Sequence, residues 1–138
     1  MCRVEPLGDT TPDHGVEHQR GRQVSEGEQG AAYGRSRCLR VAVAGDSMAP
    51  TLADGDWLLC RRVHAATGVR EGDVVLLERP DRPGLLIVKR VRRREPGGWW
   101  VEGDNAAASD DSRLFGPVPD GCLVARVVAR YWPSPRRV

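Results

Sequence analysis

One basic residue of this chain differs chemically from all the others. The sequence contains 21 basic side chains, and Lys89 is the only lysine among them. A lysine amine can lose its proton when burial penalises the charge, so it can act as a general base, which a permanently charged guanidinium cannot do. Biased codon usage that left a single lysine would also explain the pattern, and composition does not decide between these explanations.

The residues around Lys89 place it on an apolar face of an expected strand. In a strand of period two, Leu85, Ile87, Lys89 and Val91 share one face, and residues 86, 88, 90, 92 and 94 share the other. Loss of hydration should lower the pKa of the amine toward neutrality, as a general base near pH 7 requires. The alternative is that the long side chain reaches the edge of the core and keeps its charge in water.

A possible nucleophile lies upstream, in the segment "VAVAGDSMAPTL". An expected strand ends at Ala44, and Pro50 favours an extended or turn backbone just after Ser47. Such a turn can present a serine hydroxyl beside backbone N–H groups that would receive an oxyanion. Serine after Gly-Asp is also a common turn former, so this segment alone does not establish catalysis.

Both residues belong to a chain that reads as mainly β. Short apolar runs separated by Gly, Pro and Asp turns predict strands near 39–44, 57–63, 73–79, 85–93, 98–102 and 122–131. Residues 1–37 show neither helical nor strand periodicity and are expected to be disordered. The folded domain is therefore expected to span residues 38–138, with the four tryptophans mostly in its core.

Composition limits the functions open to this chain. Its 138 residues support one modest domain, and no apolar run exceeds four residues, far short of the ~20 that span a bilayer, which predicts a soluble, cytoplasmic protein without a membrane anchor. The net charge of +2 gives little support for nucleic acid as a partner. The four cysteines form no CxxC pair, so we expect no metal site, disulfide framework or cofactor. A histidine-based triad is disfavoured because His14 and His18 fall in the expected disordered segment, leaving only His64.

Four segments together resemble the type I signal peptidase superfamily. They are "SMAPTL", "GDVVLL", "KRV" and "GDNAAASDDSRLFGPVP", which occur in that family's order between residues 47 and 119. The resemblance implies a small signal-peptidase-like β fold without the large inserted domain, and a serine endopeptidase with a Ser-Lys dyad. The nucleophile would be Ser47, whose backbone N–H would contribute to the oxyanion hole, and the general base would be Lys89. Some members carry a hydroxyl two positions before the nucleophile, where this chain has Gly45.

The same resemblance assigns supporting roles in the last segment. Ser109 would hydrogen-bond the lysine amine and orient it, and Ser112 would have a positional role. Asp111 and Arg113 would form a structural ion pair. Gly103, Asp104 and Asn105 would form a turn near the dyad.

Departures from ordinary signal peptidases narrow the resemblance. Only residues 90–102 separate Lys89 from Gly103, where those enzymes usually carry a sizeable insert. The short, soluble branch that the chain most resembles is the maturation proteases of nickel-type superoxide dismutase, through "GWWVEGDN" and "VVARYWPSPR". Such a protease removes the amino-terminal propeptide of a precursor protein, so nickel would belong to the substrate.

Several alternatives remain open at this point. The superfamily also contains SOS-response repressors that cleave themselves, although residues 1–37 look too irregular for a DNA-binding domain. A general signal peptidase-like enzyme is another reading. A non-enzymatic β module could bind extended peptides at a strand edge. The absence of an aromatic stacking pattern argues against nucleic-acid binding through Arg90 and residues 92–94. Trp99 and Trp100 would line a substrate groove if they were exposed.

Overall fold

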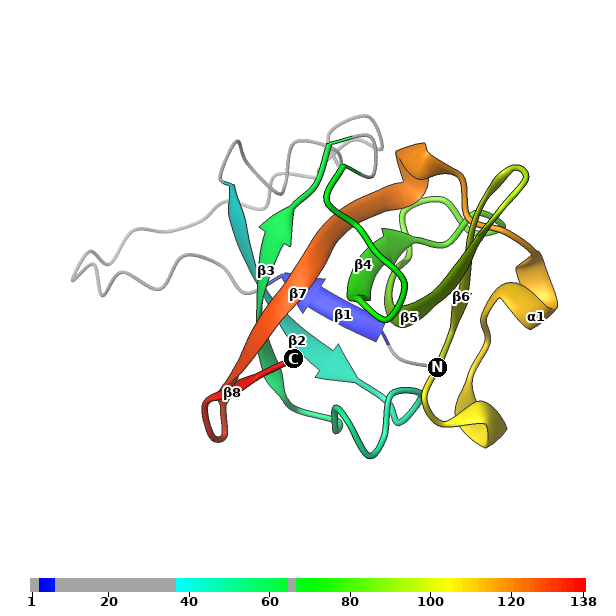
Figure 1. The fold of residues 1–138 in the computed structure, drawn as a ribbon. Coiled ribbons are helices and arrows are strands. Elements are labelled where there is room, and N and C mark those ends of the chain that lie inside the picture. Colours follow the sequence, from blue (N-terminus) through cyan, green and yellow to red (C-terminus); the bar gives the residue numbers. More distant parts are fainter. Residues whose placement is uncertain (1–2, 7–36, 65–66) are drawn as a thin grey trace, which may run out of the picture.

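The predicted mainly-β fold is confirmed by the computed structural model, which describes residues 3–6, 37–64 and 67–138 (Figure 1). Eight strands dominate it, and helical structure is confined to three single turns. The strands are β1 (Arg3–Pro6), β2 (Cys38–Ala44), β3 (Trp57–Arg62), β4 (Val74–Glu78), β5 (Leu86–Glu95), β6 (Gly98–Glu102), β7 (Leu123–Trp132) and β8 (Arg136–Arg137). The helical turns are η1 (Ala106–Ala108), α1 (Ser112–Phe115) and η2 (Asp120–Cys122).

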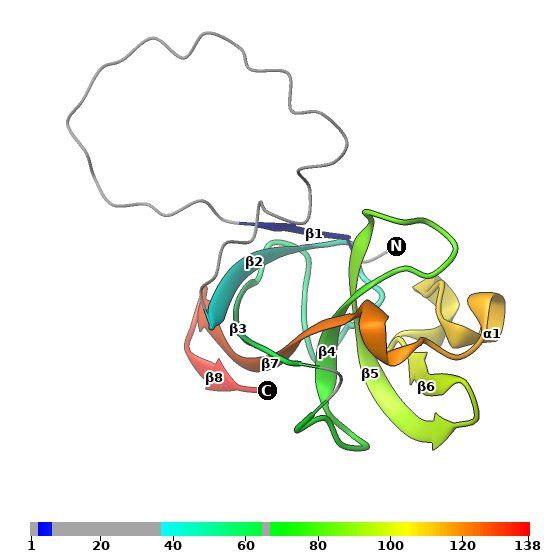
Figure 2. The same ribbon diagram turned by 90° about the horizontal axis from the view of Figure 1, so that it is seen from above.

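Six of the strands close into a ring. The sheet order runs β1-β2-β3-β7-β4-β5-β6, and β1 also pairs with β5, so the first six strands form a small antiparallel barrel (Figure 2). Strand β6 extends the sheet beyond β5, and β8 pairs with β7. Closure brings β2, which precedes Ser47, and β5, which carries Lys89, to either side of β1.

The amino-terminal prediction needs a correction. Residues 1–37 were expected to form no regular structure, yet Arg3–Pro6 form β1, in register with β2 from Arg3 opposite Ala44 to Pro6 opposite Val41. A run of four residues is too short to show a clear periodicity. Whether it forms a strand depends on its pairing with partners far along the chain, which the local sequence does not show. The rest of that prediction concerns residues 1–2 and 7–36, which lie outside the described residues.

Two apolar clusters lie on the two faces of the coiled sheet. Strand alternation sends Leu86 and Val88 of β5 into one cluster, with side chains of β2, β3, β4 and β7, and sends Ile87 and Val91 into the other. The second cluster contains residues of β4, β6 and the segment after it. Strand β5 is therefore buried on both faces up to Lys89 and becomes exposed at residues 92–94.

No helix in the described part of the chain has the length and apolar character needed to cross a membrane.

Candidate active site

Ser47 and Lys89 meet inside the molecule. Lys89 Nζ donates a hydrogen bond of 2.8 Å to Ser47 Oγ, although 42 residues separate them in the sequence. Both residues have a relative exposure of 0%. An amine and a hydroxyl at this distance can exchange a proton directly.

The turn that carries Ser47 is anchored by its apolar neighbours. Met48 and Leu52 are fully buried in the cluster inside the barrel, and the Leu52 N–H donates to the Met48 carbonyl at 2.9 Å. Gly45, which begins the turn, has a φ of 96°, a conformation that suits glycine. The Ser47 backbone N–H donates to no acceptor in the described part of the chain. The turn therefore holds a fixed hydroxyl beside an available backbone donor.

The "GDN" turn fits against the Ser47 turn. The Asn105 N–H donates to the Ser47 carbonyl at 2.9 Å, and Asn105 Nδ2 donates to the Asp46 carbonyl at 3.1 Å. A Cβ atom at Gly103 would lie 2.2 Å from Ser109 Oγ and 2.6 Å from the Ser47 carbonyl oxygen. Glycine is therefore required at position 103, because any side chain there would push the two segments apart.

Asp104 connects three segments of the site. It accepts two hydrogen bonds from Arg90, at 2.8 Å to Oδ1 and 2.9 Å to Oδ2, and one from Thr51 Oγ1 at 2.6 Å. Burial raises the pKa of Asp104, but the hydrogen bonds from Arg90 and Thr51 outweigh it, and the pKa is lowered overall. The carboxylate thereby ties the strand of Lys89 to the loop after Ser47.

Sequence reasoning did not assign Arg90 or Thr51 to the site. The sequence places Arg90 in "KRV", on the strand face opposite Lys89, and Thr51 in "SMAPTL", without a site role for either. One signal could have identified the contact between Arg90 and Asp104. Arg90 directly follows Lys89, and the sequence assigns no partner to Asp104 of the "GDN" turn.

Asp111 is saturated with donors from its own segment. It accepts from the Gly103 N–H at 3.0 Å, from Ser109 Oγ at 2.8 Å and from Arg113, whose Nε and Nη2 lie 2.9 Å and 2.6 Å from its two oxygens. Burial raises the pKa of Asp111, but these hydrogen bonds together hold it well below its ordinary value. Ser112 Oγ accepts from the Val101 N–H at 2.8 Å, which attaches α1 to β6.

Ser109 therefore lies beside the dyad turn, with its hydroxyl donated to Asp111 and its side chain against Gly103. Its proposed role in orienting Lys89 stays a prediction.

The tryptophans do not all lie in the core. Trp57 and Trp132 are 39% and 56% exposed, so the expectation of burial is wrong for these two. They lie opposite each other on β3 and β7. Trp99 and Trp100 are partly buried under Arg94 and Arg93, whose guanidinium carbons lie 4.8 Å and 4.7 Å from the ring centroids.

The described residues contain no group of three or more His, Cys, Asp or Glu side chains that could hold a metal ion. His64 is exposed and lies in the loop that follows β3, in a segment distinct from the Ser47 turn.

A small β barrel with a buried serine hydroxyl facing an amine is an arrangement suited to a hydrolytic enzyme. Residues 11–114 match the Peptidase S24-like family, and the chain belongs to that family. The match includes Ser47, Lys89 and the part of the "GDN" segment that ends at Leu114.

Curated relatives point the same way. The chain is 33% identical over 114 residues to mitochondrial inner membrane protease subunit 1 of Xenopus tropicalis, covering 67% of this chain and 68% of the relative. The corresponding human subunit is 31% identical over 114 residues, with 67% and 69% covered, and subunit 2 of Saccharomyces cerevisiae is 29% identical over 120 residues, with 68% of each covered. The predicted membership of a signal-peptidase-like protease superfamily is confirmed. These relatives are named for an inner membrane protease and not for superoxide dismutase maturation.

Proposed function

We propose that this protein is a serine endopeptidase in which Ser47 is the nucleophile and Lys89 the general base. The observation that carries this proposal is the 2.8 Å contact between Lys89 Nζ and Ser47 Oγ, with both residues fully buried. Burial disfavours the charged form of an amine, and a neutral amine at this distance can accept the serine proton. Membership of a peptidase family supports the same reaction.

The reaction would proceed in two halves. Lys89 takes the proton of Ser47 Oγ while that oxygen attacks the scissile carbonyl carbon, giving a tetrahedral oxyanion. The carbon–nitrogen bond then breaks, and the departing amine takes the proton from Lys89. Lys89 next removes a proton from water, which attacks the acyl ester, and Ser47 recovers its proton as the second product leaves. No metal or organic cofactor is needed in this sequence of steps.

The surroundings of the dyad support a preorganised site. The Ser47 N–H is available to donate to the oxyanion, and the Asn105 contacts fix the turn that aims it. Gly45 supplies no side-chain hydroxyl, so a second oxyanion donor must come from elsewhere. Ser109 is proposed to orient the amine of Lys89 from its place beside Gly103.

For the substrate, we propose the amino-terminal propeptide of a soluble precursor in the cytoplasm, with the precursor of nickel-type superoxide dismutase as the first candidate. Two features support this candidate. The segments "GWWVEGDN" and "VVARYWPSPR" resemble those of the maturation proteases of nickel-type superoxide dismutase, and the spacing between Lys89 and Gly103 is short. The curated relatives are named as inner membrane proteases, which favours a second candidate, the cleavage of proteins at a membrane.

The test is mass spectrometry of two substrate arms incubated with the protein. The first arm is a nickel superoxide dismutase precursor and the second a library of signal peptides. Each is treated with wild-type protein, with Ser47→Ala and with Lys89→Arg. Trimming at one amino-terminal site by the wild type alone supports the dyad, and the arm that is trimmed identifies the substrate class.

Other outcomes separate the alternatives. Cleavage of this chain in the absence of any substrate, lost in Ser47→Ala, would indicate a self-cleaving protein. Peptide binding without cleavage in every arm would indicate a non-enzymatic β module. Trimming that persists in purified Ser47→Ala would overturn the nucleophile assignment.

A further inference from the structure

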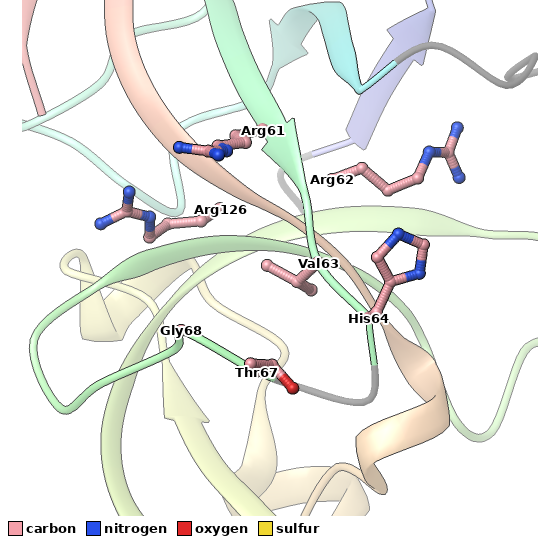
Figure 3. A pocket seen from close by; sticks show the side chains of 7 residues that line it. All are labelled: Arg61, Arg62, Val63, His64, Thr67, Gly68 and Arg126. Carbon is pink, nitrogen blue, oxygen red and sulfur yellow. The ribbon is translucent and has the colours of Figure 1, made fainter.

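A second polar site lies where β3 leaves the barrel. A cavity of about 380 Å³ is lined by residues 61–64, 67, 68 and 126, from the end of β3, the loop after it and β7 (Figure 3). The volume is at the lower end of the range for small-molecule sites. Of the described residues that line it, three are arginines, one is histidine, and none carries a carboxylate. The electrostatic character of this pocket is therefore that of an anion site.

The most informative feature of the pocket is a pair of arginines on neighbouring strands. Arg61 of β3 and Arg126 of β7 are directly opposite in the antiparallel register, and their side chains project to the same side (Figure 3). Like charges at directly opposite positions destabilise a sheet. In the described part of the chain neither guanidinium forms an ion pair, whereas Arg79, Arg90 and Arg113 each pair with aspartate. An anion between Arg61 and Arg126 would remove this repulsion.

We propose that this pocket binds the phosphate group of a small soluble ligand between Arg61 and Arg126. A carboxylate has two oxygens in one plane and can be satisfied by a single guanidinium, as Asp81 is by Arg79. A phosphate group has more acceptor oxygens and a charge approaching two, which suits two guanidinium groups on adjacent strands. Thr67, with a hydroxyl donor, lines the same cavity.

The pocket is separate from the dyad. Val75 of β4 is the register partner of both Lys89 on β5 and Arg126 on β7. Lys89 and Arg126 therefore lie on the same face of the sheet. Their backbones are two strand spacings apart, or about 10 Å. The proposal requires no chemistry at Ser47, so it stands or falls independently of the proteolytic function. Ser47→Ala protein can also be used in the binding test, which removes any effect of hydrolysis.

The test is isothermal titration calorimetry of the full chain in a buffer without phosphate. The probes are inorganic phosphate, adenosine monophosphate and acetate, and the variants are Arg61→Ala and Arg126→Ala. Arg82→Ala is the matched control, since Arg82 is exposed and forms no ion pair in the described structure. We expect saturable binding of both phosphate probes, weakened about tenfold or more in each pocket variant and less than twofold in the control. A thermal unfolding midpoint at or above that of the wild type would show that the variants are folded, because each pocket variant removes one of two like charges at opposite positions.

Several results would overturn this inference. Acetate binding as tightly as phosphate would show that the pocket does not select phosphate over a carboxylate. An equal loss of phosphate affinity in Arg82→Ala would show that the loss results from the change in net charge and not from the pocket. A last arm sediments the protein with vesicles of an anionic phospholipid: vesicle binding that depends on Arg61 and Arg126, without binding of the soluble probes, would assign the pocket to a lipid headgroup and contradict a soluble ligand.

Discussion

Two aspartates of the same segment stabilise different parts of the molecule. Asp111 binds partners that lie within eight residues of it along the chain, namely Gly103, Ser109 and Arg113. Asp104 binds Thr51, 53 residues away, and Arg90, 14 residues away. Asp111 thus fixes the shape of its own segment, while Asp104 fixes how three segments meet around the dyad.

The difference separates stability from catalytic geometry. A buried carboxylate that satisfies several donors makes the segment around it rigid, and its loss leaves those donors unpaired. A carboxylate that bridges distant segments has its largest effect on the relative positions of the groups it connects. We therefore expect changes at Asp111 to appear mainly in unfolding and changes at Asp104 mainly in activity, with the dyad as the most sensitive point.

The largest effect is expected at Lys89. Lys89→Arg keeps the positive charge but provides no base, so kcat/KM on the trimmed precursor should fall by about 10²- to 10⁴-fold. Lys89→Met is the companion variant, because it preserves an unbranched side chain without charge and should be equally inactive. Circular dichroism establishes that each variant is folded. Full activity in either folded variant would contradict the general-base assignment.

The rate should also depend on pH in a defined direction. The reaction needs the neutral amine, so kcat/KM rises as pH increases and the amine loses its proton. Because Lys89 is fully buried, the apparent pKa of this rise should lie well below the value of about 10.4 for a solvated lysine. A rate profile measured between pH 5 and pH 11 tests this. A rise that begins only near pH 10 would mean that burial does not promote loss of the proton.

Asp104→Asn and Asp111→Asn test the comparison directly. Asn at position 104 removes the ion pair with Arg90 and should reduce kcat/KM by about 10- to 100-fold through misplacement of Ser47 relative to Lys89. Asn at position 111 should lower the free energy of unfolding by about 2 to 3 kcal/mol. Glu95→Gln, which breaks a surface pair with Arg93, is the control and should change neither by much. Urea unfolding and steady-state kinetics on the three variants are sufficient. If the two aspartate variants lost activity and stability in the same proportion, the distinction would fail.

The sequence was informative where structure depends on neighbouring residues. The six longer strands follow from alternation and turn residues. The resemblance of four ordered segments paired Ser47 with Lys89, and the structure brings these two side chains into contact. β1 was missed because its pairing with β2 and β5 is a property of the closed barrel. Arg90 was missed for a related reason, since its carboxylate partner approaches only when β5 and the "GDN" turn come together. The exposure of Trp57 and Trp132 depends on which face of β3 and β7 turns outward, and residue type does not fix that.

Acid should affect the two aspartates through linkage. The folded pKa of Asp111 is held well below its ordinary value, as is that of Asp104 to a lesser extent. A lowered folded pKa contributes stability that is fully present above the unfolded value of about 3.9 and is lost as pH falls through the folded pKa. Wild-type protein should therefore lose stability steadily below about pH 5, and Asp111→Asn should show a shallower slope. Urea unfolding midpoints at pH 7, 5, 4 and 3 measure this dependence. If stability fell with pH equally steeply in the wild type and in Asp111→Asn, the lowered pKa of Asp111 would be contradicted.

The smallest effect is expected from Arg90→Lys. Lysine keeps the charge next to Asp104 but replaces two directed hydrogen bonds with one point charge. The bridge to Thr51 stays in place, so we expect stability to fall by less than about 1 kcal/mol and kcat/KM by a few-fold. Arg90→Ala is the paired variant and should approach the loss seen in Asp104→Asn, because each removes the same contact. In a double-mutant cycle, Arg90→Ala combined with Asp104→Asn should cost little more activity than either change alone. Additive losses would show that Arg90 and Asp104 act separately, and Asp104 would then hold the dyad through Thr51 instead.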